Sequence, residues 1–214
     1  MKLKVNEIFF SIQGESTFSG RPCVFVRLTG CNLRCSYCDT KYAYEEGEYM
    51  EVEQIIDRVS SYGCKLVEIT GGEPLIQENT PYLIEELIDA GFQVLLETNG
   101  TKDINIVDKR CIKIVDIKCP FSGEADKNDF ENLKRLGKKD EVKFVIADRK
   151  DYEFAKAVLK KWKLVPFKPN PVHFSPVYNI LDPKLLAEWI LEDRLMVRLN
   201  LQLHKLIWGD LRGV

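Results

Sequence analysis

The chain contains 214 residues, of which 45% are hydrophobic and 30% are charged, and its formal net charge at pH 7 is −2. A chain of this length buries roughly 70% of its unfolded surface around one core without disulfide staples, so we expect a single domain over residues 1–214. The nearly neutral charge excludes a bulk attraction to nucleic acid or to an anionic membrane, and partners must therefore be recognised through specific sites.

The amino-terminal segment, MKLKVNEIFFSIQGES, has a short apolar run that Gln13 and Glu15 interrupt. It has neither the long apolar region nor the small-residue cleavage site of a secretory signal. No stretch of the chain approaches the ~20 apolar residues needed to span a bilayer. We therefore expect a cytoplasmic protein. Its seven cysteines, an odd number, indicate free thiols, metal ligands or catalysis rather than a disulfide framework.

Strand-like segments alternate with helix-like segments along the chain. The strands are rich in β-branched and aromatic residues, and helical spacing with a closing glycine or an early proline marks the helices. The expected strands are 23–28, 66–70, 92–98, 112–118, 142–147, 172–177 and 196–203, and the expected helices are 52–63, 80–91, 151–162 and 182–193.

This alternation predicts an α/β fold with a parallel sheet and right-handed crossovers. About six such units are too few for a closed eight-stranded barrel and suit an open or partial one. Strands 66–70, 92–98 and 112–118 are nearly continuous apolar runs, as expected for strands covered on both faces. Each ends in polar residues, at the carboxyl edge where ligands bind in this architecture.

Three cysteines follow the first of these expected strands. Cys31, Cys35 and Cys38 have the pattern C-x3-C-x2-C, with Tyr37 directly before the last thiol. A closed structural zinc site normally needs four protein ligands, and both histidines of the chain lie far away in the sequence. Three thiolates can instead hold a 4Fe-4S cluster with one iron open to an external chelating ligand. Structural zinc and three coincidental thiols remain the alternatives at this point.

Three further segments place polar residues or glycines after expected strands. TGGEP at 70–74 lies between a strand and a helix, and its two consecutive glycines let the backbone approach a ligand closely. LETNGT at 96–101 and DIKCP at 116–120 end the next two strands, where Glu97 and Asn99 can exchange hydrogen bonds with hydroxyl groups. Taken singly, these segments also fit a turn and two capped strand ends.

The cysteine spacing with its aromatic residue resembles the radical S-adenosylmethionine (SAM) superfamily. That resemblance implies a partial (β/α)6-type TIM barrel with trimmed helices, a 4Fe-4S cluster on Cys31, Cys35 and Cys38, and SAM on the open iron. It also assigns SAM binding to the glycine motif and to the two later strand ends. The residues implied to bind SAM are Tyr37, Gly71, Gly72, Glu73, Glu97, Asn99, Asp116, Lys118, Cys119 and Pro120.

FFSIQGES near the amino terminus, GRPCVFVRLTGCNLRCSYCDT around the cysteines and LQLHKLIWGDLRGV at the end together resemble the 7-carboxy-7-deazaguanine synthase family. The resemblance covers nearly the whole chain. It implies a lyase that converts 6-carboxy-5,6,7,8-tetrahydropterin to 7-carboxy-7-deazaguanine with release of ammonia, in queuosine and 7-deazapurine biosynthesis.

The same resemblance implies Mg2+ on Thr40, with Asp39 as its acidic neighbour. The residues implied to bind the substrate are Ile12, Gln13, Gly14, Glu15, Arg27, Thr70, His204 and Val214.

The polar members of this set suit such a substrate. Gln13 can donate and accept, Glu15 can accept from amino and ring N–H groups, and Arg27 can grip a carboxylate. Arg27 lies in an otherwise apolar run, VFVRL, where burial without an anion would be costly, so we expect a ligand anion there. The sequence identifies no side chain as a catalytic base.

Two features of the sequence must be weighed against the family pattern. Ser16 stands where the family usually has a glycine, which alters the turn but removes no functional group. The other four thiols, Cys23, Cys64, Cys111 and Cys119, are widely spaced, which disfavours an auxiliary cluster.

The resemblance further implies a homodimer and a reducing partner such as flavodoxin or ferredoxin, with no direct contact to nucleic acid or membrane. The main rival is an activating enzyme that makes a glycyl radical on a partner protein. Such an enzyme would share the cluster, but a protein partner would not explain Gln13, Glu15, Arg27 and His204 together. A structural zinc module is the rival from a different class of protein.

Overall fold

The structure is a computed structural model, and it describes residues 1–164 and 170–214. One nine-stranded sheet has the order β3-β1-β2-β4-β5-β6-β7-β8-β9. The strands are β1 (Lys2–Ile12), β2 (Pro22–Leu28), β3 (Glu48–Glu51), β4 (Leu66–Gly71), β5 (Gln93–Thr98), β6 (Ile112–Ile117), β7 (Glu141–Ile146), β8 (Val172–Pro176) and β9 (Arg198–Leu199).

Six α-helices accompany the sheet in the described residues. They are α1 (Val52–Ser60), α2 (Thr80–Asp89), α3 (Asn132–Arg135), α4 (Arg149–Trp162), α5 (Pro183–Glu192) and α6 (Leu203–Trp208). Short 3-10 turns occur at Lys41–Tyr44, Pro74–Ile76, Ile104–Ile106, Pro120–Ser122 and Ala125–Lys127. No helix among the described residues combines the length and the apolar character needed to cross a membrane.

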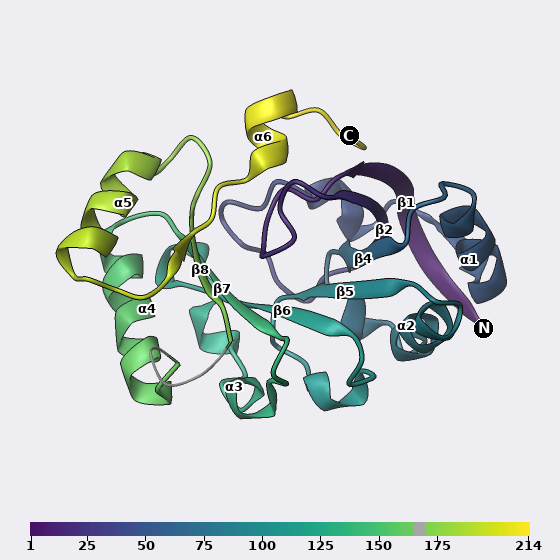
Figure 1. Cartoon of the computed structure of the whole chain (residues 1–214), viewed down its shortest axis with the longest axis horizontal. Coiled ribbons are helices and arrows are strands. Elements are labelled where there is room, and N and C mark those ends of the chain that lie inside the picture. Colours follow the sequence, from purple (N-terminus) through teal and green to yellow (C-terminus); the bar gives the residue numbers. More distant parts are fainter. Residues whose placement is uncertain (165–169) are drawn as a thin grey trace.

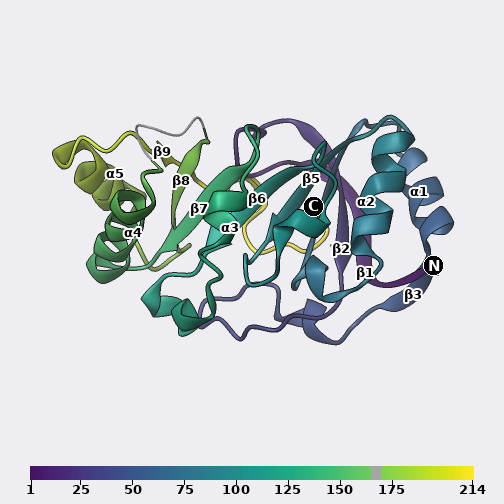
Figure 2. The same ribbon diagram turned by 90° about the horizontal axis from the view of Figure 1, so that it is seen from below.

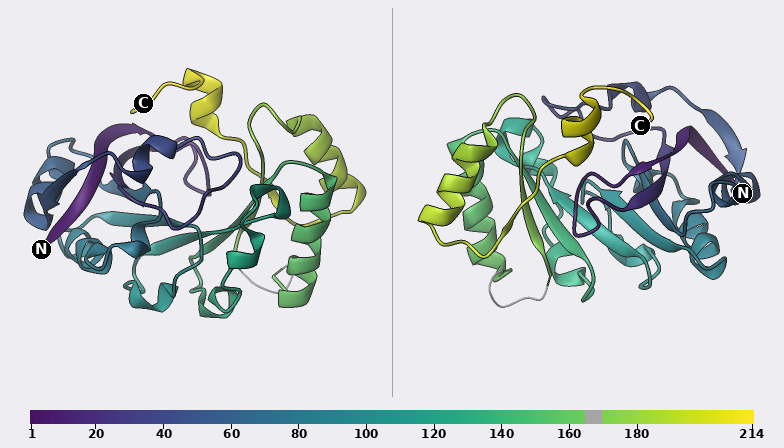
Figure 3. Two further views of the ribbon diagram at one scale, coloured as in Figure 1. Left: turned by 180° about the vertical axis from the view of Figure 1, so that it is seen from behind. Right: turned by 45° about the horizontal axis from the view of Figure 1, so that its top comes forward.

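The sheet curves into an open trough rather than a closed barrel (Figure 1). Helices α1 to α4 cover its outer face, as the view from below also shows (Figure 2). Helix α6 lies on the other side, above the opening of the trough (Figure 3). The α/β partial barrel expected from the sequence is therefore confirmed.

Strand direction divides the sheet into two parts. From β2 through β4 to β9, every neighbouring pair is parallel, as predicted. Strand β1 instead runs antiparallel to both β2 and β3, and neither β1 nor β3 was among the expected strands. Together they extend the sheet beyond β2, so that the amino-terminal segment forms one wall of the trough.

The last expected strand, 196–203, is much shorter in the structure. Strand β9 contains only Arg198–Leu199, because the chain then turns away from the sheet. Asn200 N still donates to Phe174 O at 3.0 Å, but Leu203 N donates to Gly14 O at 2.9 Å, in the loop after β1. The closing segment therefore crosses the trough instead of extending the sheet.

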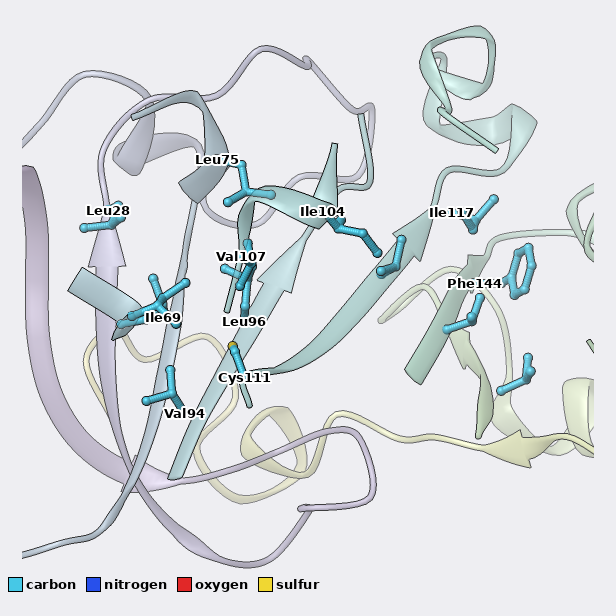
Figure 4. Close-up of a cluster of buried hydrophobic side chains, with 14 of the residues drawn as sticks. Leu28, Ile69, Leu75, Val94, Leu96, Ile104, Val107, Cys111, Ile117 and Phe144 are labelled. Carbon is cyan, nitrogen blue, oxygen red and sulfur yellow. The ribbon is translucent and has the colours of Figure 1, made fainter. Parts of the chain in front are cut away.

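Alternate residues of the parallel strands face two different environments. One face packs against the helices as the main core, where Ile69, Leu96 and Phe144 are fully buried (Figure 4). On the opposite face, Phe25, Leu66, Leu95, Ile112 and Ile114 form a smaller apolar cluster that closes the floor of the trough. Toward the carboxyl ends of the strands, the residues on this inner face become polar and line a cavity.

We expect Phe144→Ala to weaken the main core. Phe144 is 0% exposed and its ring meets Phe174 edge-on at 5.6 Å between centroids. Truncation should lower the free energy of unfolding by about 3–5 kcal/mol because a cavity remains, as measured by urea denaturation. Leu191→Ala, 75% exposed on α5, should change it by less than about 0.5 kcal/mol. Equal losses in both variants would contradict this description of the core.

Candidate active site

A cavity of about 630 Å³ opens on the inner face of the sheet. It collects nearly all of the site residues predicted from the sequence, although they come from distant segments of the chain. Those lining it are Ile12, Gln13, Gly14, Glu15, Arg27, Cys31, Cys35, Tyr37, Cys38, Asp39, Thr40, Thr70, Gly71, Gly72, Glu97, Asn99, Asp116, Lys118, His204 and Val214. Glu73, Cys119 and Pro120 do not line it.

The three clustered cysteines lie side by side on the cavity wall as half-buried free thiols. Burial raises the pKa of the Cys35 thiol to about 11, with Lys118 opposing the shift and the two neighbouring cysteines adding to it. Such thiols ionise readily only when bound cations neutralise them. The cysteine loop therefore has the donors and the electrostatics of a metal-binding loop.

The thiols suit a cluster better than a single ion. Within residues 1–164 and 170–214, no group of three or more His, Cys, Asp or Glu side chains is arranged around one metal position. Structural zinc would require its ligands to converge at about 2.3 Å from one point. A 4Fe-4S cluster distributes its thiolate ligands over separate irons, so it needs no such convergence of the three cysteines on one point.

The TGGEP segment packs directly against the cysteine loop, backbone against backbone. A Cβ on Gly72 would lie 2.0 Å from Gly30 O and 2.8 Å from the Cys31 Cβ. Gly71 has φ +139°, and a Cβ there would lie 2.1 Å from Leu28 O. Glu73 N donates to Gly30 O at 2.8 Å. The glycines are thus needed for close contact between this segment and the chain itself.

Glu73 lies behind the cavity wall rather than on it, completely buried. Its carboxylate accepts hydrogen bonds from Leu75 N at 3.0 Å, Thr98 Oγ1 at 2.8 Å and Asn99 N at 2.6 Å. It therefore connects the TGGEP segment to the LETNGT segment. Cys119 is also fully buried, in the main core, and Pro120 begins a 3-10 turn.

Unpaired polar atoms remain around Lys118. Its ammonium binds Asp116 Oδ2 at 2.7 Å and lies 5.9 Å from the centroid of the Tyr37 ring. The other oxygen of Asp116, Oδ1, and the Tyr37 hydroxyl are buried without a hydrogen-bond partner among the described residues. Buried polar groups are usually satisfied, so this part of the cavity has the character of a binding site for a polar ligand.

Lys143 forms the charged centre of the cavity, and the sequence analysis missed it. Its ammonium lies 2.9 Å from Glu15 Oε2 and 2.5 Å from Glu97 Oε1. Burial alone would raise the pKa of Glu15, but Lys143 and a hydrogen bond from Gln202 Nε2 at 2.8 Å lower it to about 2. The sequence did contain a signal for it. Lys143 is a charged residue within the apolar run VKFVIA, just as Arg27 is within VFVRL, and such a residue needs a buried partner of opposite charge.

Gln13 is held at both ends of its side-chain amide. Its Oε1 accepts from Glu15 N at 3.0 Å, and its Nε2 donates to Glu68 Oε2. Glu68 is a second cavity residue that the sequence analysis did not single out. These two contacts fix the orientation of the Gln13 side-chain amide in the cavity.

Arg27 has an anion within the chain, contrary to the reasoning that its burial required a ligand. Its Nε lies 2.7 Å from Glu7 Oε1, and the Tyr42 hydroxyl donates to the same oxygen at 3.2 Å. Glu7 belongs to β1, which the sequence did not indicate as a strand. Arg27 nevertheless lines the cavity.

The carboxyl-terminal segment closes the opposite side of the cavity. The His204 ring packs so tightly on Gly14 that a Cβ there would lie 2.0 Å from His204 Nδ1. Thr40 Oγ1 donates to Asp39 Oδ1 at 2.8 Å, and Lys205 of α6 lies 3.5 Å from Asp39 Oδ2. The pair Asp39-Thr40 thus faces the cavity beneath α6, next to the cysteine loop.

Comparison with known proteins identifies the family of the chain. Residues 25–163 match the family model of the radical SAM superfamily. The chain is 45% identical to the 7-carboxy-7-deazaguanine synthase of Koribacter versatilis, covering 99% of this chain and 100% of that protein. It is 46% identical to the enzyme of the same name from Chlorobaculum tepidum, covering 99% and 97%.

Solved structures show the same architecture. QueE from Escherichia coli superposes with a TM-score of 0.79 at 26% identity, over 95% of both chains. SuiB from Streptococcus suis, solved with S-adenosylmethionine bound, has a TM-score of 0.51 at 13% identity over 81% of this chain and 44% of its own. The second similarity concerns the fold alone.

We expect Lys143→Met to destabilise the protein strongly. The change leaves the buried carboxylates of Glu15 and Glu97 without their cation, and breaking a buried pair in this way costs about 3–5 kcal/mol. Urea denaturation at neutral pH measures the loss. Lys184→Met, at a side chain 79% exposed on α5, is the control and should stay within about 0.5 kcal/mol of the parent. Similar values for the two variants would contradict the central role of Lys143.

Proposed function

Because the chain belongs to the 7-carboxy-7-deazaguanine synthase family of radical SAM enzymes, we propose that its cavity converts 6-carboxy-5,6,7,8-tetrahydropterin to 7-carboxy-7-deazaguanine with release of ammonia. One observation carries the proposal. The cysteine loop, residues 70–72 of the TGGEP segment and the QGE segment at 13–15, which are far apart in the sequence, line a single cavity. The product belongs to queuosine and 7-deazapurine biosynthesis.

Cys31, Cys35 and Cys38 are the residues that would hold the 4Fe-4S cluster, with SAM beside them. When bound, the reduced cluster and SAM supply the radical that removes hydrogen from the substrate. Gly71 and Gly72 would leave space for the methionine part of SAM. At the ends of β5 and β6, the residues that would meet the ribose and adenine parts include Glu97, Asn99, Asp116 and Lys118, and Tyr37 of the cysteine loop would also contact SAM.

The substrate would lie between the loop after β1 and the carboxyl-terminal segment. Gln13 retains one N–H and one lone pair for a pterin edge, and Lys143 keeps Glu15 charged as an acceptor. Arg27 uses its Nε for Glu7, which leaves its terminal amino groups for the substrate carboxylate. Thr70, His204 and the backbone of 12–14 complete the proposed set, with Val214 at the rim.

Mg2+ would bind at Thr40, with Asp39 as the neighbouring carboxylate. Both line the cavity and hydrogen-bond to each other. Mg2+ is usually held by one or two protein oxygens together with substrate and water. This position is adjacent to Cys38 in the sequence, so metal and cluster would lie in one loop.

We also propose a homodimer, a location in the cytoplasm, and a small reducing protein such as flavodoxin or ferredoxin as electron donor. The cysteines are all free thiols, which suits a reducing compartment. The three cluster thiols are only half buried, so an electron can reach this loop from outside. Nothing in the comparisons favours the rival activating enzyme or a zinc module.

Activity tests the proposed function directly. Anaerobically reconstituted and reduced protein is incubated with SAM, Mg2+ and the carboxytetrahydropterin, and products are separated by chromatography and mass spectrometry. We expect 7-carboxy-7-deazaguanine and ammonia in equal amounts, and none when SAM is omitted. If 5′-deoxyadenosine forms without any deazaguanine, the substrate assignment is wrong and only the superfamily chemistry remains.

We expect Thr40→Ala to weaken the Mg2+ site without disturbing the cluster. Loss of one oxygen ligand should raise the Mg2+ concentration needed for half-maximal turnover by about 10-fold or more. The visible absorbance and iron content of the reconstituted variant should equal those of the parent, because no cysteine changes. An unaltered Mg2+ dependence would place the metal elsewhere.

A further inference from the structure

Glu68 lies on the inner face of β4, two residues before Thr70. It lines the cavity and is only 6% exposed. One carboxylate oxygen, Oε2, accepts from Gln13 Nε2, and Oε1 has no hydrogen-bond partner in the described part of the chain. Its position therefore presents one free carboxyl oxygen to the proposed substrate site.

Glu68 differs from the other carboxylates of the cavity. Glu15 and Glu97 share the ammonium of Lys143, and Asp116 has that of Lys118. Among residues 1–164 and 170–214, Glu68 forms no ion pair, and its hydrogen-bond partner is a neutral amide. A buried carboxylate without a cation holds a proton more tightly than one that shares an ammonium group, because burial disfavours the charged form.

The charged and titratable groups around Glu68 come from four elements. They are Glu97 on β5, Lys143 on β7, Glu15 in the loop after β1 and Cys23 on β2. Burial raises the pKa of Glu68 to about 8, with the charge of Glu97 adding to the shift and Lys143 opposing it. A general base or acid is most effective when its pKa lies near the working pH.

We propose that Glu68 transfers the proton in the elimination that releases ammonia from the contracted ring, an inference that rests on the proposed function. A ring C–H bond breaks and its electron pair forms the ring C=C bond, while the C–N bond to the departing amine breaks. The proton passes from carbon to the Glu68 carboxylate and from there to the departing nitrogen, which leaves as ammonia. Glu68 returns to its starting state, and no electron is gained or lost.

A positioning role through Gln13 is the competing explanation for Glu68. Glu68→Gln separates the two roles, because the new amide oxygen still accepts from Gln13 Nε2 and the side-chain volume is kept. Glu68→Asp retains the carboxyl group on a side chain that is one methylene shorter. Glu188→Gln, at an exposed glutamate on α5, is the matched control for the removal of one carboxylate.

The experiment measures two steps in the reconstituted enzyme. Substrate deuterated at carbon 6 reports the first step through deuterium that appears in SAM, and ammonia with 7-carboxy-7-deazaguanine reports the last. For Glu68→Gln we expect deuterium transfer at the parent rate and product formation reduced on the order of 100-fold or more. Glu68→Asp should recover part of this loss, and Glu188→Gln should lose nothing.

The pH profile supplies an independent measurement. Product formation by the parent should rise with pH and level off near the pKa of about 8, because the ionised form is the base, and Glu68→Gln should lose this rise. Product formation by Glu68→Gln within a few-fold of the parent would overturn the proposal. So would an equal loss of deuterium transfer and product. Absence of deazaguanine with the parent enzyme would instead show that the proposed function itself is wrong.

Discussion

The arrangement of the cavity depends on one buried ammonium group. Lys143 on β7 neutralises Glu15 from the loop after β1 and Glu97 from β5, and Gln202 adds a hydrogen bond from the carboxyl-terminal segment. Four parts of the chain that lie far apart in the sequence are thereby held at one point. Without this cation the carboxylates would repel each other in a poorly solvated space, and the loop that presents Gln13 would lose its orientation.

A second constraint is steric and concerns the end of the cavity that the cysteine loop lines. Backbone atoms of Gly71 and Gly72 lie against Leu28 and Gly30 at distances that leave no space for a side chain. This contact fixes the position of the cysteine loop relative to the ends of β2 and β4. Glu73 then joins the same wall to the end of β5. Electrostatics therefore organise the end of the cavity around Lys143, and backbone packing organises the end around the cysteine loop.

The features that the sequence predicted are those encoded locally. Apolar runs identify β4 to β6. The spacing of Cys31, Cys35 and Cys38, all within eight residues, indicates a metal-binding loop. The features it did not predict depend on distant pairing. Glu7 becomes the partner of Arg27 only when β1 pairs antiparallel with β2, and Lys143 meets Glu15 across 128 positions. The strand expected at 196–203 ends early because Leu203 bonds to Gly14, which no local pattern reveals.

The hydrogen bond from Leu203 to Gly14, with the His204 ring on the same glycine, joins the beginning of the chain to its end. During synthesis, the loop after β1 leaves the ribosome early, whereas its partner is among the last segments to be made. The trough and its cysteine loop can therefore form while the mouth above them is still uncovered.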